Sequence, residues 1–368
     1  MKSSAGVFAA LTCAATLTCQ IQGPGSPPRV NPDLSVTYFV NVDAADVRLA
    51  DSVFSLGPPF LPFTKGPDGI WSLTTPPYEP GTHVYGFVID GVPTGARSDN
   101  SLNDRLPQSY YPFELIDVRG SEPLFYDPQP VPHGTLHVHT FRSELFQRAV
   151  KATVYTPPGY EVSDQAYPAL YLLHGETEGT SFWTRYGYAD RIMDNLIASG
   201  DARPMIVVMP DTGSATGSNQ PMDLVEHYLI EDVIPWVEQR YRVDRSPAAR
   251  FLAGNSAGGG HARNIGFLHP EMFSALGMMS GGGIGAAGAP LQVTYPKLMD
   301  AAAFNAQVTR IQISLGDHDD SNPNIMANVQ RLKDSLDQLG ITSTLNVTTG
   351  RHNWFNWRRY LAEFLKGL

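Results

Sequence analysis

The chain has 368 residues, of which 42% are hydrophobic and 17% are charged. It is therefore long enough for one large and one small folded domain with a sizeable core. Its formal net charge is −10 at pH 7, which argues against nucleic acid or an anionic membrane surface as a partner.

The first residues have the pattern of an export signal. An uncharged apolar run covers residues 5–17 and is too short to span a bilayer, and a Gly- and Pro-rich stretch follows at 23–28. We therefore expect residues 1–22 to be a signal peptide and the protein to be secreted or periplasmic, without a transmembrane span. Both cysteines, Cys13 and Cys19, lie in this segment, so we expect neither structural disulfides nor cysteine catalysis.

Short segments of strand character, separated by turn residues, occupy residues 30–118. The clearest candidates are residues 35–42, 70–73 and 84–89. Several short strands at such intervals predict a small β-sandwich. A Pro-rich linker is expected over residues 119–134.

Strands and helices alternate in residues 135–368. Two runs, 169–173 and 205–209, have the continuous hydrophobicity of buried parallel strands. Further strands are expected at 136–141, 149–155, 311–315 and 342–347, and helices at 192–198, 223–241, 325–339 and 357–368. Pro235 should kink its helix or mark a restart. This alternation predicts an α/β fold with a mainly parallel central sheet covered on both faces.

The most informative motif is Gly254-Asn-Ser256-Ala-Gly258. It follows a short apolar run and precedes a helix-compatible segment at 262–268. In a nucleophile elbow the serine lies on a strained turn between a strand and a helix, and small flanking residues let the backbone bend without a Cβ clash. A flexible Gly-rich loop is the alternative interpretation, and the flanking strand and helix patterns favour the elbow.

A serine nucleophile needs a base, and the base needs an acid that orients it. In α/β-hydrolases the chain order is serine, acid, histidine. The predicted strand ending at residue 315 runs into Asp317, Asp319 and Asp320, and the strand ending at residue 347 runs into a loop that carries His352. Because open α/β sheets place their sites at the carboxyl ends of the strands, we predict a triad of Ser256, His352 and one of these three aspartates.

The loop after the first buried parallel strand, residues 174–179, is expected to supply the second backbone donor of an oxyanion hole. A carboxylate beside a developing oxyanion would oppose catalysis, so the Glu176 side chain must point away or be neutralised. Three aromatic side chains near the predicted site could stack on a phenolic acyl group, with core packing as an equally strong alternative: Trp183, Tyr186 and Trp354.

The chain resembles bacterial carbohydrate esterases of the feruloyl esterase and acetyl xylan esterase kind, in the esterase D-like branch of the α/β-hydrolases. The resemblance covers roughly residues 130–368. It rests on Val131-Pro-His-Gly134, Tyr155-Thr-Pro-Pro-Gly-Tyr160, Tyr171-Leu-Leu-His-Gly175, Asp194-Asn-Leu-Ile-Ala198, Pro204-Met-Ile-Val-Val-Met-Pro210, the serine motif, and His352 followed by Trp354-Phe-Asn-Trp. The N-terminal β-domain (residues 30–118) is similar to the immunoglobulin-like module, related to glycogen-binding modules, that often precedes these esterases.

The resemblance implies an α/β-hydrolase fold for residues 135–368, with Ser256 as the nucleophile and His352 as the base. The acid of this family lies in a Gly-x-x-Asp turn, which matches Gly316 and Asp319 here, with Asp317 and Asp320 as rivals. The oxyanion donors implied are the backbone N–H groups of Ala257 and Glu176.

Two departures from the family pattern concern the walls of the pocket. Asn255 and Ala257 stand where relatives commonly carry leucine and methionine, and Arg351 replaces the second glycine of Gly-Gly-His-x-Trp. We expect these changes to affect the choice of substrate rather than hydrolysis itself.

The function that the resemblance implies is an exported serine esterase that removes feruloyl or acetyl groups from plant cell-wall polysaccharides such as arabinoxylan, or from their oligosaccharides. No cofactor is expected. No metal site is expected either, because the histidines at 133, 137 and 139 lack a matching carboxylate cluster. The alternatives are a siderophore esterase of the enterochelin type, an acyltransferase, or a non-catalytic carbohydrate-binding protein.

Overall fold

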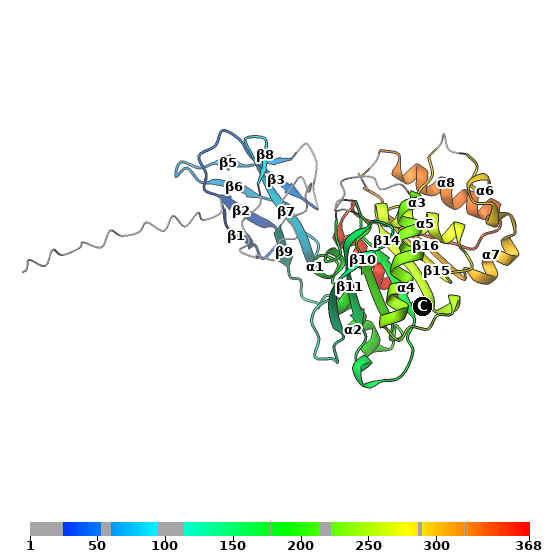
Figure 1. Ribbon diagram of the computed structural model, residues 1–368. Helices are drawn as coiled ribbons and strands as arrows, with labels where there is room; N and C mark the ends of the chain where they lie inside the picture. Colours follow the sequence, from blue (N-terminus) through cyan, green and yellow to red (C-terminus); the bar gives the residue numbers. More distant parts are fainter. Residues whose placement is uncertain are drawn as a thin grey trace, which may run out of the picture.

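The computed structural model describes residues 25–52, 60–94, 114–176, 178–213, 222–285, 289–319, 321 and 323–368. The predicted signal peptide, with both cysteines, and Asp320 lie outside these residues. Figure 1 shows an N-terminal region of strands beside a larger region in which helices surround a central sheet. Within the described ranges, no helix has both the length and the apolar character needed to cross a bilayer.

The N-terminal region consists of two antiparallel sheets. One has the strand order β1-β2-β6-β5, and the other has the order β4-β3-β7-β8 with β9 paired to β7. The strands are β1 (Gly25–Val30), β2 (Val36–Val40), β3 (Val47–Asp51), β4 (Leu61–Pro62), β5 (Thr64–Lys65), β6 (Trp71–Thr74), β7 (Gly81–Ile89), β8 (Val92–Thr94) and β9 (Glu114–Val118). This region fits the predicted all-β fold, and its immunoglobulin-like character stays a prediction.

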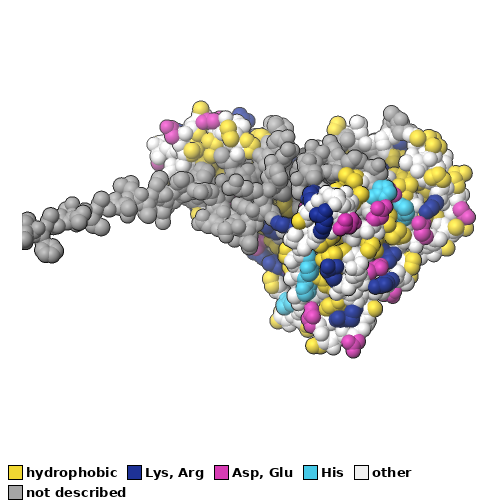
Figure 2. All heavy atoms as spheres, in the orientation of Figure 1, with side chains coloured by type: hydrophobic (Ala, Val, Ile, Leu, Met, Phe, Trp, Pro, Cys, Tyr) yellow, Lys and Arg dark blue, Asp and Glu magenta, His cyan; other side chains and the backbone are white. Residues whose placement is uncertain are grey.

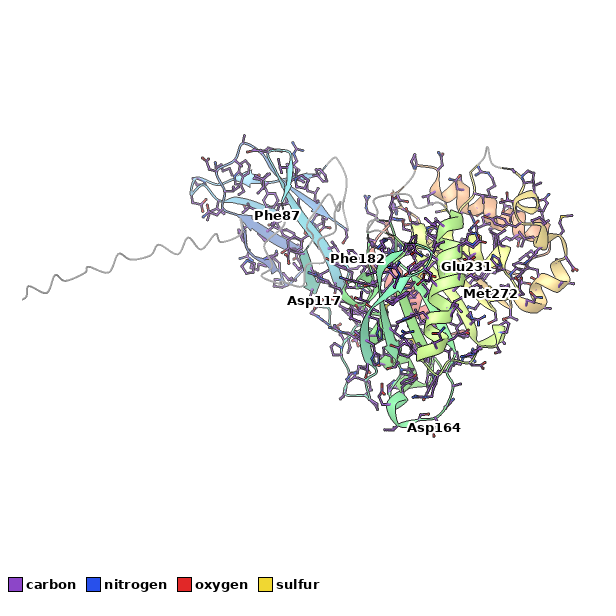
Figure 3. The ribbon with its side chains drawn as sticks, in the orientation of Figure 1. Phe87, Asp117, Asp164, Phe182, Glu231 and Met272 are labelled. Atoms are coloured by element: carbon purple, nitrogen blue, oxygen red, sulfur yellow. The ribbon has the colours of Figure 1, made fainter. Side chains whose placement is uncertain are left out.

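One hydrophobic cluster joins the two sheets into a sandwich. Tyr38 of β2, Leu49 of β3 and Phe87 of β7 are buried in it, and Phe87 lies among the strands of this region in Figure 3. Trp71 and Tyr85 belong to the same buried cluster. Because their rings pack inside the sandwich, neither offers a free platform for a sugar.

The C-terminal region is built on one sheet with the order β10-β11-β13-β12-β14-β15-β16-β17. Its strands are β10 (Thr135–Ser143), β11 (Arg148–Thr156), β12 (Ala169–Leu173), β13 (Ile206–Pro210), β14 (Arg250–Asn255), β15 (Ala275–Met279), β16 (Arg310–Gly316) and β17 (Thr344–Thr348). β11 is antiparallel to β10 and β13, and every later pairing is parallel. The predicted mainly parallel sheet is therefore confirmed.

Helices cover both faces of this sheet. They are α1 (Phe182–Arg185), α2 (Ala189–Ser199), α3 (Met222–His227), α4 (Ile234–Arg240), α5 (Ala257–Leu268), α6 (Leu291–Thr294), α7 (Ala301–Gln307), α8 (Ile325–Gln338) and α9 (Trp354–Leu365). Successive side chains of a strand point to opposite faces. In β12, Leu170 and Leu172 accordingly join the core beneath α2 and α9, whereas Tyr171 and Leu173 join the core beneath α3, α5 and α8.

The predicted helix at 223–241 changes its hydrogen bonding before Pro235. A π-helical segment, η3 (Tyr228–Val233), separates α3 from α4, and Pro235 is the second residue of α4. Proline has no N–H to donate to the preceding turn, and the backbone stays helical through the π-helical segment into α4, with αR geometry at Val233 and Ile234. The predicted restart is therefore not seen, and the wider hydrogen-bonded turns of the π-helical segment precede the proline instead. α9 begins three residues earlier than predicted, because the Asn353 Oδ1 accepts a hydrogen bond from the Asn356 N–H at 3.1 Å and caps the helix.

α9 also forms the junction with the N-terminal region. The His83 ring of β7 stacks on Phe355 with centroids 4.9 Å apart, and Arg359 forms an ion pair with Glu79 at 3.0 Å. Phe182 of α1 lies on the side of the C-terminal region that faces the β-sandwich (Figure 3).

Two polar side chains connect the regions at the start of this helix. The buried Arg358 guanidinium donates to the Thr82 carbonyl at 2.8 Å and to the Tyr186 carbonyl at 2.7 Å. Asn353 Nδ2 donates to the Ser52 carbonyl at 2.7 Å. The segment that follows His352 is therefore held by backbone carbonyls of both regions.

Candidate active site

Ser256 lies on a strained turn between β14 and α5. Its backbone has φ 51° and ψ −119°, a conformation that residues with a Cβ rarely adopt. The neighbouring glycines permit the turn. A Cβ on Gly258 would lie 2.6 Å from the Leu173 carbonyl oxygen, and one on Gly281 would lie 2.0 Å from the Ser256 carbonyl oxygen. The strand, sharp turn and helix together form the nucleophile elbow that the motif predicts.

The three predicted triad side chains form one hydrogen-bonded series. His352 Nε2 lies 2.9 Å from Ser256 Oγ, and His352 Nδ1 lies 2.9 Å from Asp319 Oδ2. An ionised carboxylate only accepts hydrogen bonds, so Nδ1 carries the proton in that contact. With the imidazole neutral, Nε2 is then free to accept the Ser256 hydroxyl proton.

Geometry separates the rival aspartates. The Asp319 side chain is 0% exposed and also accepts hydrogen bonds from the N–H and hydroxyl of Ser321. Burial favours the neutral acid, but the hydrogen bond and charge of His352 outweigh it, so the pKa of Asp319 lies below its ordinary value. The Asp317 side chain is 40% exposed and contacts His318. Asp320 lies outside the described residues.

The two expected oxyanion donors follow the carboxyl ends of β14 and β12, at the same edge of the sheet. Ala257 is the first residue of α5, where helix N–H groups have no partner within the helix, and Glu176 follows β12. Neither N–H is hydrogen-bonded within the described part of the chain. Residue Glu176 is exposed to solvent, as expected for a carboxylate that must stay away from an oxyanion.

A different carboxyl group, which the sequence analysis missed, is buried beside the triad. Glu178 is 9% exposed, and its Oε2 accepts hydrogen bonds from the Gly175 N–H at 2.6 Å and from Asn255 Nδ2 at 3.0 Å. The Trp354 side chain also acts on this carboxyl group and lowers its pKa. Burial raises the pKa of Glu178 to about 7 although these hydrogen bonds act in the opposite direction. The only feature of the sequence that pointed to this buried carboxyl group was Asn255, which departs from the family pattern.

The predicted aromatic pocket is only partly accessible. Trp183 is 0% exposed, and its Nε1 donates to the Leu173 carbonyl at 3.0 Å. The prediction that Trp183 lines the pocket is therefore wrong, because the ring packs in the core against Trp354 at a centroid distance of 5.0 Å. Trp354 is buried as well. Tyr186 stays partly exposed and stacks on Trp354 at 6.1 Å.

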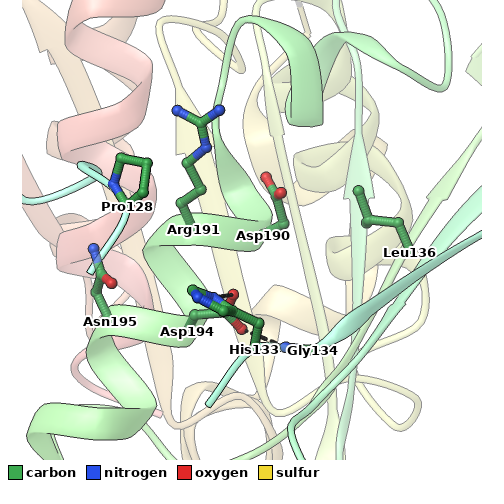
Figure 4. A pocket seen from close by; sticks show the side chains of 8 residues that line it. All are labelled: Pro128, His133, Gly134, Leu136, Asp190, Arg191, Asp194 and Asn195. Atoms are coloured by element: carbon green, nitrogen blue, oxygen red, sulfur yellow. Dashed lines mark hydrogen bonds and ion pairs between the residues drawn. The ribbon is translucent and has the colours of Figure 1, made fainter. Parts of the chain in front are cut away.

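A separate cavity of about 300 Å³ lies between the linker and α2 (Figure 4). It is lined by Pro128, His133, Gly134, Leu136, Asp190, Arg191, Asp194 and Asn195. Asp194 accepts hydrogen bonds from the His133 ring at 2.9 Å, the Gly134 N–H at 2.8 Å and the Tyr155 hydroxyl at 2.7 Å. These contacts attach the linker to the helix, and no triad residue lines the cavity.

Charge on the visible face of the C-terminal region is mixed, with acidic and basic side chains interspersed (Figure 2). The histidines of β10 form ordinary hydrogen bonds, His137 with the Thr156 hydroxyl and His139 with the Tyr241 hydroxyl. Among the described residues, no three His, Cys, Asp or Glu side chains are grouped as metal ligands.

A parallel-rich sheet with a serine on the β14–α5 elbow, and with aspartate and histidine on the loops after β16 and β17, defines the α/β-hydrolase class. The chain belongs to the esterase family whose model carries the description "Putative esterase", which matches residues 143–368. Family membership places it among the carboxylic ester hydrolases, as the resemblance implied.

Individual relatives agree with this class. An endo-1,4-beta-xylanase/feruloyl esterase of Xylanibacter ruminicola is 29% identical over 316 residues, which are 83% of this chain and 40% of that protein. The chain thus spans less than half of this relative. A solved ferulic acid esterase is 26% identical with a TM-score of 0.56, covering 64% of this chain and 97% of its own.

Another solved structure matches both regions. It is the enterobactin esterase of Shigella flexneri, with a TM-score of 0.65 and 19% identity over 95% of this chain and 96% of its own. At this identity the likeness concerns the fold alone.

Proposed function

We propose that this protein is an exported serine esterase that removes feruloyl or acetyl groups from plant cell-wall polysaccharides such as arabinoxylan. The observation that carries the proposal is the series from Asp319 through His352 to Ser256, with both hydrogen bonds at 2.9 Å, in a chain of the esterase family. This arrangement is what acyl transfer through a serine requires.

In the proposed reaction, Ser256 Oγ attacks the ester carbonyl carbon while His352 Nε2 takes the hydroxyl proton. Asp319 holds the imidazole with its other nitrogen protonated and stabilises the imidazolium that forms. The backbone N–H groups of Ala257 and Glu176 donate to the oxyanion. When the intermediate collapses, the imidazolium gives its proton to the leaving sugar alkoxide, and an acyl-enzyme remains.

Hydrolysis of the acyl-enzyme uses the same groups. His352 takes a proton from water, whose oxygen attacks the acyl carbon, and then returns a proton to Ser256 Oγ as the carboxylic acid leaves. All steps are acid–base and acyl chemistry, so the proposal includes no cofactor.

The choice of a plant ester is supported by the xylanase/feruloyl esterase relative and by the solved ferulic acid esterase. Tyr186 is the partly exposed aromatic side chain that we assign to the acyl pocket. Export is supported by the apolar N-terminal segment of the sequence, and polysaccharide esters of cell walls are substrates outside the cell.

The test measures hydrolysis of methyl ferulate and of 4-nitrophenyl acetate by the wild type, by Ser256→Ala and by the exposed control Ser246→Ala. We expect turnover of methyl ferulate that Ser256→Ala abolishes and Ser246→Ala retains. Turnover of the acetate alone would assign a deacetylase with a small pocket. Absence of Ser256-dependent turnover of either ester would refute the plant-ester assignment.

The similarity of fold to the enterobactin esterase across both regions makes a siderophore ester the useful comparison. Enterobactin is therefore added to the same assay. Hydrolysis of enterobactin in preference to methyl ferulate would replace the proposed substrate, while the serine mechanism would remain.

A further inference from the structure

We propose that Glu178 is a positioning residue, whose ionised carboxylate holds the oxyanion loop, the nucleophile strand and the histidine loop in one arrangement. Here the oxyanion loop means residues 174–176 and 178. The inference rests on the proposed function, because it concerns the oxyanion hole of a serine esterase. Glu178 itself has no assigned contact with the substrate.

The carboxylate connects three segments that are distant in the sequence. Oε2 accepts from the Gly175 N–H of the oxyanion loop at 2.6 Å and from Asn255 Nδ2 at 3.0 Å. Asn255 is the last residue of β14, immediately before Ser256. The Trp354 side chain, two residues after His352, acts on the carboxylate as well and lowers its pKa. One side chain therefore hydrogen-bonds to a chain neighbour of the oxyanion donor Glu176 and to a chain neighbour of the nucleophile Ser256.

The oxyanion loop is closed by this side chain as well as by its backbone. The Glu178 N–H donates to the Gly175 carbonyl at 3.3 Å, while the Gly175 N–H donates back to the Glu178 carboxylate. These two hydrogen bonds close a ring between Gly175 and Glu178. Glu176 lies between these two residues, so the direction of its N–H depends on the ring. Preorganised donors stabilise an oxyanion without reorganisation during the reaction, which is why the ring matters for rate.

Charge gives the carboxylate a second effect. The titratable groups that act on Glu178 are His352, on the loop before α9, and Tyr186, which follows α1. A positive His352 favours the ionised form of Glu178, and an ionised Glu178 stabilises a positive His352 equally. The imidazolium that forms when Ser256 loses its proton therefore gains a second anionic neighbour besides Asp319.

Protonation of Glu178 would change these contacts. Both hydrogen bonds to Oε2 come from N–H donors, which suit a carboxylate rather than a neutral acid. Asn255 Oδ1 is buried and has no hydrogen-bond partner among the residues that the structure describes, and rotation of this amide would present Oδ1 to a protonated Glu178. Burial raises the pKa of Glu178 to about 7. Protonation of Glu178, and with it the rotation of the Asn255 amide, would therefore occur within the pH range in which the enzyme would work.

The experiment compares the wild type with Glu178→Gln, which keeps the size of the side chain and removes its charge. At pH 8, where Glu178 is ionised, we expect kcat for 4-nitrophenyl acetate to fall about tenfold or more, with KM changed little. At pH 5.5, where the wild-type carboxyl is protonated, the two proteins should differ much less. A loss caused only by altered packing would not depend on pH in this way.

A second variant guards against misfolding of the first. Asn255→Ala removes one donor to the carboxylate, so we expect the pH-dependent step assigned to Glu178 to move to higher pH. The control Glu122→Gln changes an exposed glutamate of the linker and should leave the pH profile unchanged. Equal kcat at pH 8 in the wild type and Glu178→Gln, or a ratio independent of pH together with an unshifted Asn255→Ala profile, would overturn the inference.

Use of a generic ester keeps this inference separate from the assignment of the substrate. Failure with methyl ferulate but Ser256-dependent turnover of 4-nitrophenyl acetate would exclude the feruloyl group as the natural acyl group and would still test Glu178. The rate at which a 4-nitrophenyl phosphonate ester labels Ser256, measured by intact mass, provides the same comparison without turnover. A Ser256 that is not labelled at all would overturn both proposals.

Discussion

Replacing Arg358 with methionine tests whether the β-sandwich and the helix after His352 stabilise one another. The guanidinium is fully buried and donates to the Thr82 carbonyl of β7 and to the Tyr186 carbonyl after α1. It also lies 4.9 Å from the ring centre of Tyr126 and 5.0 Å from that of Tyr188. One side chain thus connects the sandwich, the linker and the sheet region.

The expected loss of stability comes from the hydrogen bonds that methionine cannot form. Each of the two carbonyls loses a donor, and a buried polar group without a partner costs about 1–3 kcal/mol. Against this stands the removal of a charge that burial disfavours, since burial lowers the pKa of Arg358, and methionine still fills most of the space. We expect the free energy of unfolding to fall by about 3 kcal/mol.

Urea unfolding followed by tryptophan fluorescence measures this difference. Arg359→Met is the matched control, because the side chain of that neighbouring arginine is 40% exposed and pairs with Glu79 at 3.0 Å. The free energy of unfolding of Arg359→Met should fall by less than about 1 kcal/mol. The reasoning would be refuted if Arg358→Met unfolded within about 0.5 kcal/mol of the wild type, or if the wild-type sandwich unfolded in a separate, earlier transition.

Three further predictions concern the site. Asp319→Asn should lower kcat/KM for 4-nitrophenyl acetate about a thousandfold or more, because the imidazole loses its orienting anion. Asp317→Asn should change kcat/KM little. The opposite ranking of the two variants in steady-state assays would assign the triad acid to Asp317. Gly258→Ala should lower the free energy of unfolding, measured by urea titration, by about 3 kcal/mol, since its Cβ would lie 2.6 Å from the Leu173 carbonyl oxygen. Unchanged stability would contradict the close approach of the two backbone segments at the elbow. For Glu178, burial raises the pKa from 4.5 to about 7, so the folded protein binds the proton more tightly than the unfolded chain, and stability falls as pH rises between these values. Glu178→Gln should remove this loss of about 3 kcal/mol; parallel stability curves for variant and wild type from pH 4.5 to 8 would show that Glu178 does not titrate this way.

Local patterns were sufficient to predict much of the fold. The continuous apolar runs at 169–173 and 205–209 correspond to β12 and β13. The elbow could be predicted because its requirements are local: a strand, small residues around the serine, and a helix. β15 was not predicted although its five residues are a continuous apolar run, because so short a run fits a buried strand and a segment of a buried helix equally well.

Burial and pairing of side chains were decided only by the tertiary structure. Three aspartates follow one strand, and spacing alone does not show which carboxyl group turns toward His352; the turn after β16 buries Asp319 and leaves Asp317 exposed. Trp183 near the predicted site is equally compatible with a pocket wall and a core residue, and packing against Trp354 made it core. The sequence by itself thus determined the chemical groups and their order along the chain, whereas the fold determined which of them are desolvated and within hydrogen-bond distance of each other, since both depend on segments far apart in the sequence.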